Sequence, residues 1–230
     1  MAKSKLTPQS HVTRRLRSNN NQENSLPRGV SRVLRVINTD FAQCCIAYAT
    51  SGEVKFDRID NLTDDSAGRL QSPILGPHSV GPALSIWSRL YTIIQRHFKD
   101  QWYDATLYDA RILKSYRHED KMVNAQGHHI DFCDPSCASF YSGIISLQSN
   151  TTVCICEGHK TTVVVIPQYG MVYWNGYVPH GGSAHNSQDP NYRLFFKVIK
   201  GQTRIAHNEN FQVHGFPCAH RNLLRPELRQ

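Results

Sequence analysis

Two histidines and one aspartate have the types and spacing of metal ligands. In the segment Gln126–Phe132, His129 and Asp131 stand two residues apart. Residues at this spacing project to the same side of a strand, so an imidazole nitrogen and a carboxylate oxygen would share one face. The pair alone is common in unrelated proteins, and it predicts a metal site only together with a third ligand.

His180 is the candidate for that third ligand. It follows Gly170–Gly176, a segment typical of a strand that ends in a turn, and lies 51 residues after His129. About four strands fit into this distance and would return the chain to the same end of a barrel. Pro179 and the pair Gly181-Gly182 allow a tight backbone around it. Two histidines and one carboxylate form the facial set that binds non-haem Fe(II) and leaves positions open.

Arg193 adds a second kind of group. It begins the apolar run Arg193–Ile199, in which both faces of a strand would be largely hydrophobic. A guanidinium buried there requires an anion, because burial of an unpaired charge is costly. A planar dicarboxylate would meet it in bidentate geometry.

The two histidine ligands each have a competitor. His128 could replace His129, although it would pair with Ile130 and not with an acid. His185 could replace His180, although Asn186 beside it indicates a loop. The spacing favours His129 and His180.

The other two assignments have simpler alternatives. Asp131 could cap a turn at Asp134-Pro135. Arg193 could form an ordinary salt bridge with Asp131 or Asp189. Four such residues in the right order are less expected by chance than any one of them.

The seven cysteines do not indicate a disulfide framework, since their number is odd and their density low. A zinc site from Cys133, Cys137, Cys154 and Cys156 is conceivable, but C-x3-C followed by C-x-C is not a recognised zinc spacing. We expect reduced thiols.

The elements that would position these residues are one helix followed by many short strands. Apolar residues recur at helical spacing from Ala83 to Trp102 and predict a packing helix. After Asp104 the chain changes to β-branched and aromatic runs with polar turns between them. The expected strands are Thr106–Leu113, Gly143–Leu147, Thr151–Cys156, Thr161–Ile166, Met171–Trp174 and Arg193–Ile199. Residues 60–80 have the composition of a loop. Many short strands at close spacing after one helix predict a sandwich or a closed barrel such as a jelly roll.

The net charge of +8 lies mostly in the first 30 residues, where six basic side chains face Glu23 alone. We expect residues 1–29 to form a disordered basic tail, and residues 30–230 to form one domain with its barrel core at about 106–200. The tail could contact nucleic acid or act as a nuclear address. No apolar stretch approaches the length of a membrane span or a signal peptide, so we expect an intracellular protein of the cytoplasm or nucleus, with no membrane partner.

In this order, His129-x-Asp131, His180 and Arg193 resemble the H-x-D…H…R signature of Fe(II)/2-oxoglutarate-dependent oxygenases. The flanking residues resemble the prolyl-hydroxylase and phytanoyl-hydroxylase type, and the likeness covers roughly Thr106 to Ile199. It implies a mainly β fold, a double-stranded β-helix (jelly-roll, cupin-like) backed by a long helix. It also implies that His129, Asp131 and His180 bind Fe(II), that Arg193 binds the distal carboxylate of 2-oxoglutarate, and that dioxygen is consumed.

The expected function is hydroxylation or oxidative demethylation of a protein side chain or a small molecule. Nucleic-acid demethylases of this superfamily carry a second Arg six residues after the first, where this chain has Ile199. Tyr116 and Tyr141 are candidate hydroxyl partners of the cosubstrate. The alternatives are a zinc hydrolase on the same ligands, or a non-catalytic jelly-roll binding module whose basic tail contacts nucleic acid. Because ligands at a barrel mouth lie outside the core, we expect alanine at each of the three to leave the protein folded.

Overall fold

A computed structural model describes residues 26–58, 68–99, 105–116, 129, 131, 140–157, 160–185, 187 and 189–200. The expected tail, residues 1–29, lies almost wholly outside this part of the chain. No helix among the described residues is long and apolar enough to cross a membrane.

Ten strands and two helices are described. The N-terminal elements are β1 (Val30–Val33), α1 (Thr39–Thr50), β2 (Asp57–Arg58), β3 (Arg69–Gln71) and α2 (Gly81–Phe98). The remaining strands are β4 (Ala105–Ser115), β5 (Phe140–Ser146), β6 (Thr151–Glu157), β7 (Lys160–Ile166), β8 (Met171–Asn175), β9 (His180–Gly182) and β10 (Asn191–Lys200).

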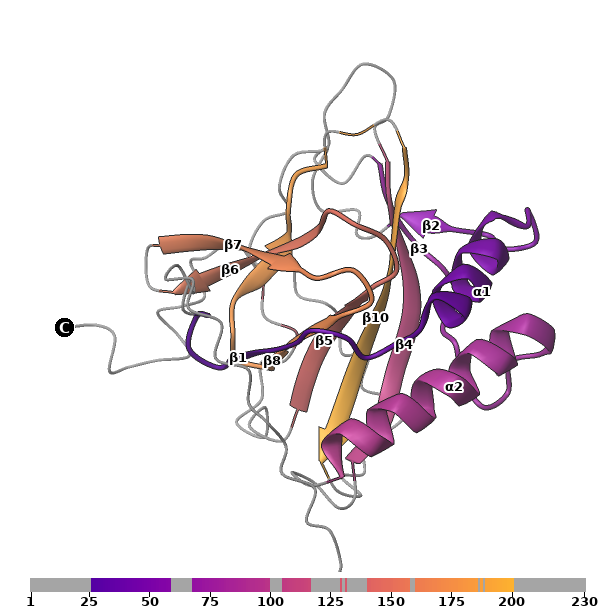
Figure 1. The fold of residues 1–230 in the computed structure, drawn as a ribbon, viewed down its shortest axis with the longest axis horizontal. Helices are drawn as coiled ribbons and strands as arrows, with labels where there is room; N and C mark the ends of the chain where they lie inside the picture. The colour runs from indigo at the N-terminus through magenta and orange to yellow at the C-terminus, as the bar shows by residue number, and fades with distance from the viewer. Residues whose placement is uncertain are drawn as a thin grey trace, which may run out of the picture.

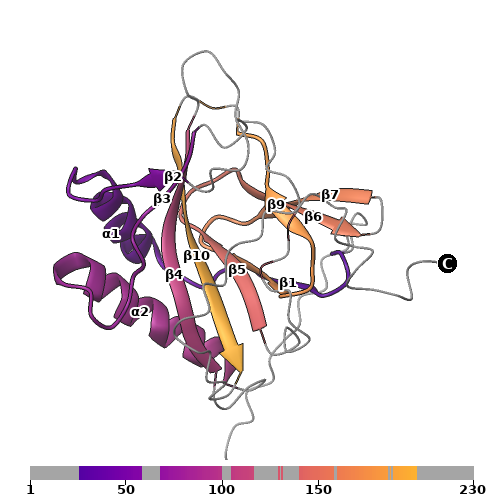
Figure 2. The same ribbon diagram turned by 180° about the vertical axis from the view of Figure 1, so that it is seen from behind.

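The strands form two antiparallel sheets that face each other. The larger sheet has the order β1-β8-β5-β10-β4-β3-β2, and the smaller has the order β7-β6-β9. In Figure 1 the long strands β4, β5 and β10 run side by side through the middle, and β6 and β7 extend to one side of them. Figure 2 shows β9 beside β6 from behind. The expected jelly-roll arrangement of a mainly β chain with flanking helices is confirmed.

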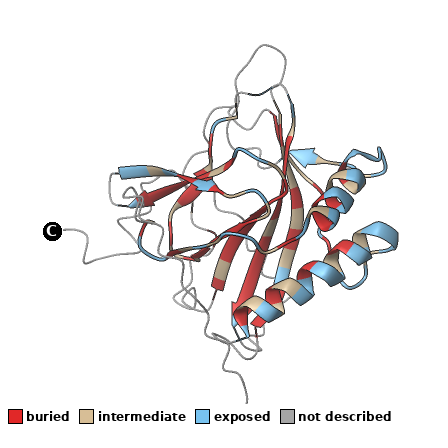
Figure 3. Ribbon diagram, in the orientation of Figure 1, coloured by how far each residue is buried: buried red, intermediate tan, exposed pale blue. Residues whose placement is uncertain are grey.

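Both helices cover the outer face of the larger sheet (Figure 1). Ile86, Leu90, Ile94 and Phe98 are buried at helical spacing on one side of α2, whose other side is exposed in Figure 3. Asn38 caps α1, because its side chain accepts a hydrogen bond from the Phe41 amide at 3.0 Å. The helices and the sheet therefore enclose one hydrophobic core.

A second hydrophobic core lies between the two sheets, and side chains of β10 alternate between the two cores. Leu194, Phe196 and Val198 pack in the helix-side core, whereas Phe195 packs against the core between the sheets. Arg193 and Lys197 share the inward side with Phe195, since they alternate with the helix-side residues. The larger sheet thus presents charged groups to the space between the sheets.

The structure contains every element that the sequence predicted, with nearly the predicted bounds, and five more. The helix expected at Ala83–Trp102 is α2, which begins at Gly81 and ends at Phe98. The six expected strands are β4, β5, β6, β7, β8 and β10. The segment expected to be a loop contains β3, and α1, β1, β2 and β9 were not predicted.

Candidate metal and cosubstrate site

Backbone pairing brings the two candidate histidines together. His129 and His180 form an antiparallel bridge, in which the His129 amide donates to the His180 carbonyl at 2.8 Å and the His180 amide donates back at 2.9 Å. β9 also pairs with β6, where His180 lies opposite Ile155. His129 therefore adds one isolated bridge to the smaller sheet beyond β9, and Asp131 follows two residues later in the chain. Four strands, β5 to β8, separate the two histidines in the sequence, as their spacing predicted.

The side chains of His129, Asp131 and His180 converge on one point. Each offers a ligand atom, and these atoms all lie within 4.8 Å of one another. The His180 Nε2 atom is 3.4 Å from the Asp131 Oδ2 atom, and the two imidazole centroids are 4.6 Å apart. Asp131 and His180 are buried, and His129 is half-buried.

The orientation of His180 is fixed from two sides. Its Nδ1 atom lies 3.0 Å from the Val178 carbonyl oxygen, so a proton on Nδ1 is donated there and the Nε2 lone pair faces Asp131. The buried Trp174 ring packs against it, with centroids 4.5 Å apart. An imidazole held in this way can coordinate a metal through the Nε2 lone pair.

The electrostatics favour the protonation states that a metal requires. Burial raises the pKa of Asp131, but Lys197 and the two histidines lower it more, so that the pKa lies well below its usual range. Burial lowers the pKa of His180 to about 4, although the Asp131 charge opposes this shift. Near neutral pH the pair is therefore a carboxylate and a neutral imidazole.

The donor set fits a divalent cation. The Asp131 Oδ2 atom is buried and accepts no hydrogen bond from the described residues, although it faces the imidazoles. A buried carboxylate oxygen without a donor is unusual, and a bound cation would satisfy it. Two nitrogens and one oxygen on one side of the ion suit Fe(II) and leave positions open for small ligands.

A cavity of about 140 Å³ connects this cluster with Arg193. Its wall combines the three candidate ligands with apolar side chains, among them Leu113, Ile144 and Phe195. Lys197, Asp109 and Arg111 also line it, the last two as an ion pair with 3.2 Å between Nε and Oδ1. The cavity is thus partly apolar, with charged groups at defined places, as ligand pockets commonly are.

Arg193 is buried on the inner face of β10, at the third residue of the strand and not at its start. Its Nη1 atom donates to the Ser115 hydroxyl at 2.8 Å, and its buried Nε has no hydrogen-bond partner among the described residues. Burial, with the nearby Arg69, lowers its pKa to about 9. No ion pair with Asp131 or Asp189 is found within the described part of the chain. The simple salt-bridge alternative therefore lacks support.

Two further basic side chains were not predicted. Arg69, from β3, is buried, and its Nη2 atom donates to the Gly182 carbonyl at 3.2 Å and to the Ser183 carbonyl at 2.5 Å, which fixes the end of β9. Lys197 lies with its Nζ atom 3.4 Å from the Asp131 Oδ1 atom. Lys197 follows Arg193 by four residues, so strand alternation would have placed it on the same face.

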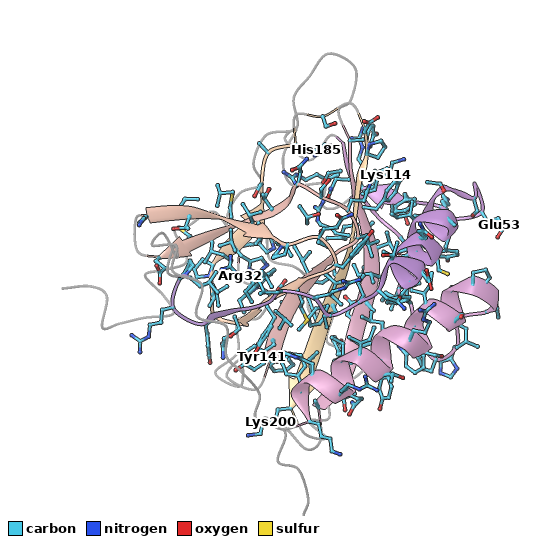
Figure 4. All side chains as sticks on the ribbon, in the orientation of Figure 1. Arg32, Glu53, Lys114, Tyr141, His185 and Lys200 are labelled. Atoms are coloured by element: carbon cyan, nitrogen blue, oxygen red, sulfur yellow. The ribbon has the colours of Figure 1, made fainter. Side chains whose placement is uncertain are left out.

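The competing residues fall in different places. His128 and the turn at Asp134-Pro135 lie outside the described residues. His185 has its Nε2 atom 2.9 Å from the Asp189 carbonyl oxygen, and it is not in the three-residue cluster. Figure 4 shows it at the upper end of the molecule.

The two tyrosines suggested as cosubstrate partners do not line the cavity. Tyr141 (Figure 4) packs on the helix side, with its ring 5.8 Å from that of Phe98. The Lys114 ammonium lies 5.3 Å from the Tyr116 ring. Ser115, not Tyr116, provides the hydroxyl next to Arg193.

Two of the four cysteines considered for a zinc site, Cys154 and Cys156, are described by the structure. Cys133 and Cys137 lie outside the described residues. Cys154 donates through Sγ to the Ser183 hydroxyl at 3.4 Å, and the Cys156 sulfur is 3.9 Å from the Thr161 hydroxyl. The cysteines of the described ranges are free thiols, as expected: Cys44, Cys45, Cys154 and Cys156.

Comparison with known proteins gives a likeness in structure but none in sequence. No family model matches the chain, and no curated protein matches it. The epimerase SnoN, solved with Fe3+, α-ketoglutarate and nogalamycin RO, aligns with a TM-score of 0.60 at 11% identity and covers 75% of this chain and 79% of its own. HygX from Streptomyces hygroscopicus, solved with nickel and 2-oxoglutarate, aligns with a TM-score of 0.54 at 11% identity and covers 76% and 84%.

A prolyl hydroxylase from Trichoplax adhaerens, in complex with a peptide of hypoxia inducible factor, aligns with a TM-score of 0.53 at 11% identity and covers 75% and 84%. At these identities the likeness shows the fold and not the activity. The chain has the jelly-roll fold of the 2-oxoglutarate- and iron-dependent oxygenases.

Proposed function

We propose that this protein is an Fe(II)- and 2-oxoglutarate-dependent dioxygenase that oxidises a protein side chain or a small molecule. The observation that carries the proposal is one cavity with two distinct poles. At one pole His129, Asp131 and His180 converge, and at the other the buried Arg193 guanidinium has an unsatisfied Nε. A metal-chelating 2-oxo acid with a second carboxylate would satisfy both.

In this proposal His129, Asp131 and His180 hold the iron. Bound Fe(II) supplies dioxygen activation, coupled to oxidative decarboxylation of 2-oxoglutarate to succinate and carbon dioxide. Val178 keeps the His180 Nε2 lone pair directed at the metal position, and Trp174 restricts the ring. The protein thus provides orientation and charge at a site where Asp131 and His180 are buried.

Arg193 binds the distal carboxylate of 2-oxoglutarate. Ser115 takes one N–H of the guanidinium and so fixes the direction of the remaining donors. Phe195 and Leu113 form apolar walls beside it, where a charge-assisted hydrogen bond is stronger than in water. This pole separates an oxygenase from a zinc hydrolase, which would not need the arginine.

The substrate class is proposed in broad terms. SnoN was solved with nogalamycin RO and the Trichoplax adhaerens enzyme with a peptide, so this fold accepts both a small molecule and a protein segment. We also propose that residues 30–230 form a single catalytic domain and that residues 1–29 are a basic tail, of which residues 1–27 are dispensable for turnover.

The test is succinate formation from 2-oxoglutarate by the purified protein with Fe(II), first alone and then with peptide and metabolite pools. We expect His129→Ala and His180→Ala to lose both divalent-metal binding and succinate formation, whereas the control His185→Ala retains them. If the wild-type protein binds no divalent metal, or if both ligand variants form succinate at the wild-type rate, the proposal fails.

A further inference from the structure

Lys197 is a buried cation beside the candidate metal ligands. It lies on the inner face of β10, and 5% of its side chain is exposed. The ammonium of a buried lysine is strongly destabilising unless an anion is near, and here the anion is Asp131. The carboxylate thus already has one positive partner before any metal binds.

The two oxygens of Asp131 have different surroundings. Oδ1 is 3.4 Å from the Lys197 Nζ atom, and Oδ2 is 3.4 Å from the His180 Nε2 atom. Only 2% of the Asp131 side chain is exposed, so water does not screen either contact. The carboxylate is therefore held with one oxygen toward the lysine and the other toward the histidines.

We propose that Lys197 is a positioning residue that holds Oδ1, so that Asp131 offers Oδ2 alone to the metal. The inference rests on the proposed function, because it assigns a role toward the metal of that site. The ammonium also supplies a positive charge to Asp131, and this keeps the ligand cluster assembled before a metal binds.

This arrangement has two chemical consequences. Lys197 and a divalent metal compete for the same carboxylate charge, so the lysine weakens metal binding. It also prevents Oδ1 from coordinating, which keeps one more position of the metal open for the cosubstrate. A lysine whose charge did not act on Asp131 would have neither effect.

Titration of the metal-free protein with Co(II), without 2-oxoglutarate, tests this role. The matched variants are Lys197→Met and Lys200→Met, which remove the same charge from the same strand. Lys200 is exposed at the end of β10, at the bottom of Figure 4. We expect Lys197→Met to bind Co(II) at least about tenfold more tightly than wild type. Its visible Co(II) spectrum should also change, because both carboxylate oxygens are then free to coordinate. Lys200→Met should match wild type in both measurements.

Equal or weaker Co(II) binding by Lys197→Met overturns the inference, since loss of a lysine that does not act on the Asp131 carboxylate would not strengthen metal binding. Lys197→Gln, also neutral, provides the same comparison if the methionine variant is recovered unfolded. Failure of both variants to fold, with and without Co(II), would make Lys197 a structural residue and would also overturn the proposal. If the wild-type protein itself binds no Co(II), the proposed function fails instead, and this outcome is distinguishable.

Discussion

Replacing Asp131 by alanine should destabilise the metal-free protein itself. Asp131 and Lys197 are paired at 3.4 Å with 2% and 5% of their side chains exposed, so removal of the carboxylate takes away a counter-charge of a buried ammonium. Loss of one partner of a buried ion pair costs about 3–5 kcal/mol of unfolding free energy. For a chain of this size the expected decrease in Tm is about 6–20 °C. The sequence predicted only that alanine at each ligand leaves the protein folded, and the buried ion pair adds the prediction that the folded Asp131 variant is less stable.

The assay is thermal unfolding in the presence of a chelator, which excludes any contribution from bound metal. Asp109→Ala is the matched control, because Asp109 belongs to a more exposed ion pair with Arg111 and its loss should cost about 1 kcal/mol or less. The double variant Asp131→Ala/Lys197→Met removes both charges and should recover at least half of the lost stability. The reasoning is refuted if Asp131→Ala is no less stable than Asp109→Ala, or if the double variant is no more stable than Asp131→Ala.

Three further predictions concern the cosubstrate pole, the pH dependence and the packing of the larger sheet. Arg193→Ala should raise the KM for 2-oxoglutarate about 30-fold or more, because about 2–5 kcal/mol of charge-assisted binding is lost. The affinity for the metal should be nearly unchanged. A lower Tm with an unchanged KM would assign the arginine to the fold. The His180 pKa of about 4 lies below that of an unfolded histidine, so unfolding takes up a proton and stability should decrease as the pH falls from about 6.5 to 4. Chemical unfolding at both pH values should show a smaller decrease for His180→Gln, and equal decreases would contradict the assigned shift. Gly143→Ala should destabilise the protein by about 1–3 kcal/mol in a urea titration, because its Cβ would lie 2.4 Å from the Phe196 ring and 2.9 Å from the Tyr173 Cβ. Gly76→Ala is the control in the same titration, since nothing lies within 4 Å of the added Cβ there.

The sequence was informative where a local pattern determines the structure. The spacing of Leu90 and Ile94 predicted α2. Runs of β-branched and aromatic residues between polar turns predicted β4, β5, β6, β7, β8 and β10. The signals of α1 were also present, since Asn38 precedes it as an N-cap and Phe41 and Cys45 form its buried side, but they were not used.

β3 and β9 could not be predicted in the same way. Each has three residues, and β9 contains two glycines, so neither shows a strand propensity of its own. They are strands because longer neighbours pair with them, β4 with β3 and β6 with β9. The same limit applies to Arg69, whose position near Arg193 depends on this pairing.

The sequence predicted the four residues of the candidate site, but it did not predict that a buried lysine lies beside the aspartate. His129, Asp131 and His180 converge in the structure, and Arg193 lines the same cavity. Their roles as iron and cosubstrate ligands stay predictions. Lys197 was assigned no role, because no motif includes it, although its spacing from Arg193 placed it on the inner face.

The edges of the larger sheet differ in how they resist association with other chains. At one edge, β2 has two residues, both charged and exposed, which is a poor template for another strand. At the other, β1 pairs along Met171–Trp174 of β8, a run of buried apolar and aromatic residues. A chain shortened past Val33 would expose this strand with its backbone donors and acceptors unpaired. The N-terminal strand therefore protects the protein from aggregation, and its loss would reduce solubility before it affected the chemistry of the site.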